Sequence, residues 1–179
     1  MIYSYSLYAK KYFERFANNK DLISLSANLD EVFNNVFDHA QSPITGYIIT
    51  QYYPKNNKLS FSICDFGIGI PSSINNKNIE NNFPIMDDWK SIIKSLEKGF
   101  SVNSTPRNRG FGLNNIIEFT ESSNGKLTII SNNGIVEKSA NSLYKAGKTE
   151  YEFKGTLIKV EVDLNTFQNK NEHEEIFDL

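Results

Sequence analysis

The strongest periodic feature of this sequence is a stripe of apolar residues between positions 29 and 40. Its members recur at alternating intervals of three residues and one: Leu29, Val32, Phe33, Val36, Phe37 and Ala40. That spacing is typical of a helix with one half-buried face. Ser26 is suited to cap the N-terminus of such a helix. We therefore predict a helix over residues 26–40 that packs against another layer of structure.

Three polar residues form a second stripe on the same helix. Glu31, Asn35 and His39 align beside the apolar face, because successive helical residues turn by about 100°. A carboxylate can act as a general base, an amide oxygen can bind Mg²⁺, and an imidazole can donate to a phosphate oxygen. A solvated polar face would show the same pattern, so this stripe alone leaves both interpretations open.

Two strands are predicted next, at "TGYIITQYY" and "KLSFSICD", joined by the turn "PKNNK". The second strand alternates apolar with small residues, which indicates one buried face. Asp65 ends this strand, and Gly67 and Gly69 follow it. A carboxylate there can accept a hydrogen bond from an exocyclic amine such as adenine N6. The glycines let the backbone approach a flat ligand, and Ile68 or Ile70 can contact its ring. A tight turn carrying a surface aspartate is the alternative.

The letters Asp-Phe-Gly at positions 65–67 also occur in protein kinases, but that class is excluded. Gly46 is the first glycine in the chain, and no His-Arg-Asp sequence precedes Asp65. A protein kinase needs both a glycine-rich loop and that catalytic loop upstream.

The remaining elements are predicted less sharply. Residues 1–25 are expected to be helical and to pack on the same domain, although their aromatic side chains could also form a dimer face. The segment from Pro71 to Asn108 is predicted to be the least regular third of the chain, with an Asn-rich patch followed by a short helix over residues 87–99. Strands are predicted at residues 126–131, 134–139 and 155–164, the first two joined by a hairpin at Asn133–Gly134. Residues 166–179 form a polar, acidic tail.

A second glycine turn opens a predicted helix at "RGFGLNNIIEFTESSNG". Free backbone N–H groups and the positive end of the helix dipole make such a start a natural phosphate site. Arg107 and Arg109 add positive charge beside it. A glycine-rich helix start is also often only a turn.

The composition favours one globular domain. The chain has 179 residues, 39% of them hydrophobic, and a formal net charge of -2, so nucleic acid is not indicated as a partner. Its one cysteine excludes an internal disulfide. No apolar run reaches the roughly 20 residues that span a bilayer, so no membrane association is expected. The charged, aromatic start lacks the apolar core of a signal peptide, and we expect a cytoplasmic protein.

Four motifs in order resemble the GHKL superfamily of ATP-binding domains, which includes DNA gyrase, ninety-kilodalton heat-shock chaperones, histidine kinases, mismatch-repair ATPases and anti-sigma serine kinases. They are "EVFNNVFDHA", "DFGIGIP", "RGFGL" and the pair Gly155-Thr156. The resemblance covers residues 26–163 and implies a Bergerat-type two-layer α/β sandwich. Such a sandwich has a mixed, mostly antiparallel sheet covered by helices on one face. It also implies a mobile ATP lid over residues 99–109.

The resemblance also implies a role for each matching residue. Glu31 would activate the attacking water or hydroxyl, and Asn35 would hold Mg²⁺ against the triphosphate. Asp65 would bond adenine N6 with support from Thr156. The remaining predicted ATP-binding residues are His39, Gly67, Gly69, Ile70, Arg107, Arg109, Gly110, Phe111, Gly112 and Leu113.

The expected function is an ATP- and Mg²⁺-dependent regulatory switch or slow ATPase that controls a partner protein. A phosphotransferase acting on a partner's serine or histidine, and an ATP-binding module without hydrolysis, are the alternatives. The separate histidine-bearing hairpin of histidine kinases and the transducer domain of gyrase-like proteins have no counterpart in this sequence. In size the chain is most similar to the anti-sigma serine kinases.

Overall fold

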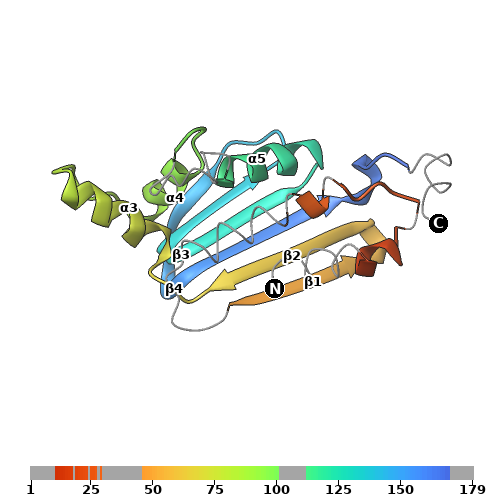
Figure 1. Cartoon of the computed structure of the whole chain (residues 1–179), viewed down its shortest axis with the longest axis horizontal. Coiled ribbons are helices and arrows are strands. Elements are labelled where there is room, and N and C mark those ends of the chain that lie inside the picture. Colours follow the sequence, from red (N-terminus) through yellow and green to blue (C-terminus); the bar gives the residue numbers. More distant parts are fainter. Residues whose placement is uncertain are drawn as a thin grey trace, which may run out of the picture.

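A computed structural model describes residues 11–17, 19–23, 25–27, 29, 46–100 and 112–169. It shows an α+β fold with a four-stranded sheet in the order β1-β2-β4-β3 (Figure 1). The strands are β1 Tyr47–Tyr53, β2 Lys58–Asp65, β3 Lys126–Ser139 and β4 Lys145–Asp163. The helices are α3 Gly69–Glu80, α4 Asp88–Ser95 and α5 Gly112–Ser122, and two 3₁₀ turns span Pro54–Asn56 and Leu164–Thr166. Every pairing between these strands is antiparallel, where a mixed, mostly antiparallel sheet was expected.

The antiparallel register places apolar side chains from different strands in rows on the buried face of the sheet. Ile63 on β2 lies opposite Ile158 on β4, which lies opposite Ile129 on β3. The next row is Phe61, Val160 and Leu127. All six are at most 1% exposed, and full burial of such a side chain stabilises the fold by about 1.5–3 kcal/mol. The alternation in "KLSFSICD" therefore predicted the buried face of β2 correctly.

Segments from both ends of the described chain contribute to this core. Phe13, Leu22, Leu25 and Leu29 are completely buried. Lys20 forms an isolated antiparallel bridge with Asn169, so the first and last described segments lie side by side. Phe167 lies in the predicted polar tail, yet it is buried. Its ring packs edge-on against that of Phe119 in α5, with 6.2 Å between the ring centroids. The start of that tail is thus part of the domain.

Strand β3 reverses direction near its middle. In a continuous extended strand, Lys126 and Glu137 would lie more than about 30 Å apart. Instead their side chains form an ion pair, and the N–H of Ala140 donates to the carbonyl of Gly125 at 3.0 Å. Asn132 takes a positive φ of 52°, as tight turns require. These contacts agree with the hairpin predicted at Asn133–Gly134, with both arms inside β3.

Two predictions for these segments differ from the structure. Helix α3 occupies the Asn-rich region after Gly69, which was predicted to be irregular, and it projects away from the end of the sheet (Figure 1). Strand β4 begins at Lys145, ten residues before the predicted start at Gly155. Most side chains between 145 and 154 are exposed, so this part of β4 lacks the hydrophobic alternation that marks a half-buried strand.

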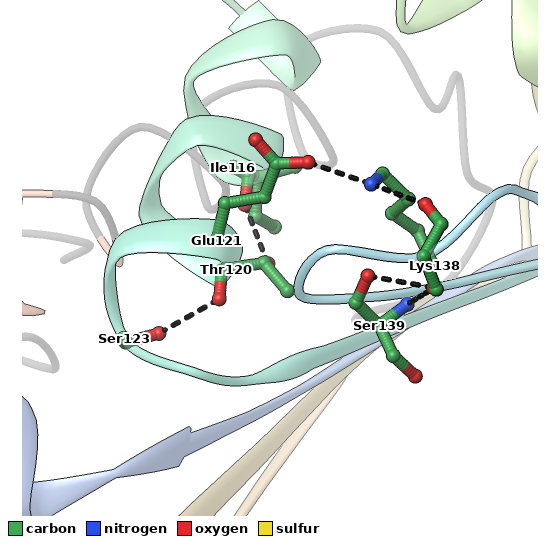
Figure 2. A network of polar contacts seen from close by, with 7 residues as sticks. Ile116, Thr120, Glu121, Ser123, Lys138 and Ser139 are labelled. Atoms are coloured by element: carbon green, nitrogen blue, oxygen red, sulfur yellow. Dashed lines mark hydrogen bonds and ion pairs between the residues drawn. The ribbon is translucent and has the colours of Figure 1, made fainter.

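A buried ammonium group joins α5 to β3 (Figure 2). The Nζ of Lys138 lies 2.6 Å from Glu121 Oε1 and donates to the carbonyl of Ser142 at 2.7 Å. Within α5, Thr120 Oγ1 donates to the carbonyl of Ile116. Because Glu121 lies at the end of α5, this network holds that helix end against the β3–β4 connection.

Among the described residues, no helix is long and apolar enough to cross a membrane.

Candidate functional site

One row on the buried face of the sheet is polar. It continues the apolar rows by one step and consists of Asp65 on β2, Thr156 on β4 and Ser131 on β3. Asp65 lies opposite Thr156, and Thr156 lies opposite Ser131. All three are at most 5% exposed. Buried polar side chains are costly unless they are hydrogen-bonded, so this row marks a specialised place in an otherwise apolar layer.

Asp65 is the only carboxylate in this row. Its Oδ1 accepts a hydrogen bond from the N–H of Gly67 at 2.8 Å. Burial raises the pKa of the Asp65 carboxyl above its usual value, while hydrogen bonds from Gly67 and from the backbone and hydroxyl of Thr156 lower the pKa in part. Among the described residues, the groups that hold the carboxyl are neutral donors.

The segment after Asp65 turns sharply into α3 at Gly69. Gly69 has a φ of 77°, and a Cβ atom built on it would lie 2.6 Å from Asn132 Oδ1 and 2.8 Å from Ser131 Oγ. Gly155 has a φ of 116°, and its Cβ would lie 2.2 Å from the carbonyl oxygen of Asp65. Both positions require glycine for conformation and for space. The backbones of three segments thus meet closely around the polar row.

Ser131 and Asn132 fasten the start of α3 to the sheet. The N–H of Ile70 donates to Ser131 Oγ at 3.0 Å, and Asn132 Nδ2 donates to Ser72 Oγ at 2.9 Å. Neither Ser131 nor Asn132 was predicted as a site residue. A serine that ends a predicted strand has no distinctive sequence signal, because its importance depends on which strands become neighbours.

The predicted site residues divide into three groups. Asp65, Gly67, Gly69, Ile70 and Thr156 are described and lie in one cluster around the polar row. Gly112 and Leu113 are described at α5, and the rest lie outside the described residues: Glu31, Asn35, His39, Arg107, Arg109, Gly110 and Phe111. The general base, the Mg²⁺ ligand and most of the lid therefore remain predictions.

The predicted phosphate-binding helix start is described in part. Gly112 is the first residue of α5 that the structure describes, and the glycine turn predicted before it lies outside the described residues. Leu113 is half-buried and packs against the hydrophobic core, as Ile70 does. The start of α3 and the described start of α5 thus contact the same core.

The cluster around Asp65 can accept hydrogen bonds from a ligand amine. Its ionised carboxylate is an acceptor on a floor otherwise made of hydroxyl groups and close-packed backbone. Within the described part of the chain, no group of three or more His, Cys, Asp or Glu side chains could hold a metal ion.

A groove of about 770 Å³ lies elsewhere, between the first described segment, α5 and the residues after β4. Asp21, Glu118, Phe119 and Phe167 are among its lining residues. None of the predicted site residues that the structure describes is among those that line it. Its lining is a mixture of polar and apolar surface residues, so we place the candidate site at the polar row.

No family model matches the sequence, and no curated protein matches it. The functional argument therefore depends on the residues themselves.

Proposed function

We propose that this chain is a GHKL-type ATP-binding domain with a Bergerat-type fold, and that it acts as an ATP- and Mg²⁺-dependent regulatory switch or slow ATPase. The observation that carries the proposal is the buried Asp65–Thr156 pair beside a tightly packed glycine turn. The sequence motifs assigned these residues to one adenine pocket, and they lie together in an α+β fold of the expected kind.

The chemistry of Asp65 supports adenine over guanine. Adenine presents an N6 amine, which donates hydrogen bonds, whereas guanine presents its O6 carbonyl at the same place, which accepts them. An ionised carboxylate accepts from the first and repels the second. Thr156 and Gly67 already donate to Asp65, which fixes the direction in which the carboxylate faces.

In this proposal the other residues complete the site. Asn35 holds Mg²⁺, Glu31 activates the attacking water, and the N–H groups at Gly110 and Gly112 contact the phosphates. Residues 99–109 close over the bound nucleotide as a lid. A partner protein then distinguishes the closed state from the open one.

Calorimetry of the purified protein with ADP and ATP, with and without Mg²⁺, tests the proposal. We expect binding of both nucleotides in the wild type and a loss of about tenfold or more in Asp65→Asn, because an amide presents a donor as well as an acceptor. Asp87→Asn is the matched control, since Asp87 is a surface carboxylate that pairs with Lys90 at 2.9 Å. Wild-type protein that gives no heat with either nucleotide would refute the adenine site.

Incubation with radiolabelled ATP distinguishes hydrolysis, phosphate transfer to a protein and binding without turnover. Release of free phosphate that disappears in Glu31→Ala supports the ATPase switch. Label transferred to a protein would support the phosphotransferase alternative instead. Binding without turnover in the wild type would reduce the proposal to an ATP-binding module.

A further inference from the structure

The hydroxyl group of Ser131 joins three segments at the floor of the candidate site. Ser131 is completely buried. Its Oγ donates to the carbonyl of Gly155 at 2.7 Å, accepts from the N–H of Ile70 at 3.0 Å, and lies 3.2 Å from Thr156 Oγ1. These partners belong to β4 and to the first turn of α3. One small side chain therefore links the glycine turn to the strand that carries Thr156.

A count of protons assigns the direction of each bond. A serine hydroxyl has one hydrogen, and the short contact to the Gly155 carbonyl uses it. The bond from Ile70 then occupies a lone pair of Ser131 Oγ. Thr156 can approach Ser131 only as a donor, so its hydroxyl lies between two acceptors, Ser131 Oγ and the Asp65 carboxylate. Ser131 therefore helps to set the orientation of the Thr156 hydroxyl beside Asp65.

The same junction sets the spacing between the glycine turn and the Asp65 row. A Cβ on Gly69 would lie 2.8 Å from Ser131 Oγ and 3.0 Å from the Gly155 carbonyl oxygen, so the turn is in close contact with the junction. A base held at Asp65 must also fit against this turn. Without the Ser131 hydroxyl, the N–H of Ile70 and the carbonyl of Gly155 lose a shared partner, and the spacing is no longer fixed.

We propose that Ser131 is a positioning residue that sets the base specificity of this site. It acts through Thr156, Gly155 and the start of α3, and it need not touch the base. This inference rests on the proposed function and adds to it the residue that makes the pocket select adenine. Phosphate contacts come from other segments in that proposal, so loss of Ser131 should weaken base recognition more than phosphate recognition.

The test compares ADP and GDP affinities by calorimetry in the presence of Mg²⁺, for wild type, Ser131→Ala and Ser91→Ala. Ser91 is the control because it is also completely buried but its Oγ has no hydrogen-bond partner among the residues that the structure describes. We expect Ser131→Ala to weaken ADP binding about fivefold to tenfold, as loss of one or two hydrogen bonds implies, with little change for GDP. The preference for ADP over GDP should fall by the same factor, and Ser91→Ala should keep the wild-type preference.

Several outcomes would overturn the inference. An equal loss for both nucleotides would show that Ser131 only supports the fold, and unchanged ADP affinity would show that it has no role in the site. If the wild type binds neither nucleotide, the proposed function fails, and this inference fails with it. If Ser131→Ala does not fold, Ser131→Cys keeps the volume with a weaker donor. An unreduced ADP preference in that variant would equally overturn the inference.

A measurement without ligand isolates the positioning step. Hydrogen exchange at the Ile70 amide should be about fivefold faster or more in Ser131→Ala than in wild type, because its acceptor is gone. Equal exchange would show that Ser131 does not hold the glycine turn. The exchange rate can be unchanged in Ser131→Ala while the wild type still binds ADP. In that case this inference fails and the proposed function does not.

Discussion

Asp65 and Thr156 lie opposite each other on β2 and β4, and their side chains are 2% and 5% exposed. The hydrogen bonds from Thr156 and Gly67 do not fully offset the desolvation of the Asp65 carboxyl, so its pKa is raised. An ionised carboxylate at this place is unfavourable for the unliganded fold. A further hydrogen-bond donor, such as the amine of the proposed ligand, would reduce this cost.

The first prediction is that Asp65→Asn stabilises the unliganded protein at neutral pH. The folded pKa lies above the unfolded value of 3.8, so the folded state binds more protons than the unfolded state between these two values. The free energy of unfolding therefore falls as the pH rises through that window, and the penalty persists above it. Asparagine has the same shape without the charge. The gain in the free energy of unfolding of Asp65→Asn over the wild type should therefore be present at about pH 7.5 and vanish below about pH 4.

Urea denaturation at several pH values checks this prediction. Asp87→Asn should behave with the opposite sign, because a hydrogen bond with Lys90 lowers the pKa of Asp87 and favours its ionised form in the fold. A destabilised Asp65→Asn at neutral pH would show that hydrogen bonds to the ionised carboxylate outweigh its desolvation.

The second prediction concerns crowding at the glycine turn. Gly69 and Gly99 have nearly the same backbone conformation, with φ of 77° and 78°, but a Cβ on Gly99 would meet nothing within 4 Å. Gly99→Ala should therefore cost about 1 kcal/mol, the conformational term alone. Gly69→Ala should cost about 1–3 kcal/mol more, because its methyl group would clash with Asn132, Ser131 and Gly155. Thermal or chemical unfolding measures both, and equal losses would mean that the turn has room to relax.

The sequence predicted β2 and its terminal carboxylate because the alternating pattern and the aspartate both lie within one strand. "KLSFSICD" alternates apolar and small residues, and Asp65 follows the last apolar position. Thr156 was paired with Asp65 through the motif resemblance, and the register of β2 with β4 places them opposite each other. Ser131 could not be found this way, because the polar row exists only after three strands have paired.

Helix α3 was missed for a different physical reason. Its sequence "GIPSSINNKNIE" is rich in asparagine and serine, which compete for backbone hydrogen bonds and are poor helix formers. Tertiary contacts compensate for this at the start and in the middle of the helix. Ser131 holds the N–H of Ile70 at the start of α3, and Asn75 bonds to the backbone of Met86 further along. Contacts between segments distant in sequence cannot be anticipated from local propensity.

The third prediction concerns the buried ammonium group in Figure 2. The side chain of Lys138 is 10% exposed, and it pairs with Glu121 and with the carbonyl of Ser142. Lys138→Met should lower the free energy of unfolding by about 1–2 kcal/mol, since charge-assisted bonds to a partly exposed partner are lost. Lys94→Met is the control: Lys94 and Glu97 pair in the open, with side chains 40% and 53% exposed, and such pairs contribute about 0–1 kcal/mol.

The same variant has a spectroscopic consequence. Burial raises the pKa of Tyr144, and the nearby Lys138 ammonium opposes that rise. Removal of the ammonium in Lys138→Met should therefore raise the pKa of Tyr144 further, which ultraviolet titration of the phenol detects. An unchanged phenol titration would place Lys138 out of electrostatic contact with Tyr144 in solution.

The last prediction concerns the segment between α3 and α4. Asn75 Nδ2 donates to the carbonyl of Met86 at 3.0 Å, and the N–H of Met86 donates back to Asn75 Oδ1 at 2.9 Å. This pair of bonds holds a loop on which Phe83 and Ile85 are 64% and 69% exposed. Asn75→Ala should remove both bonds and cost about 1–2 kcal/mol. Exchange of the Met86 amide should be about tenfold faster, because its acceptor is lost while the rest of the domain stays folded. Asn76→Ala, at an exposed position of the same helix, should leave that exchange unchanged. Equal Met86 exchange in the two variants would show that the loop is held by contacts other than Asn75.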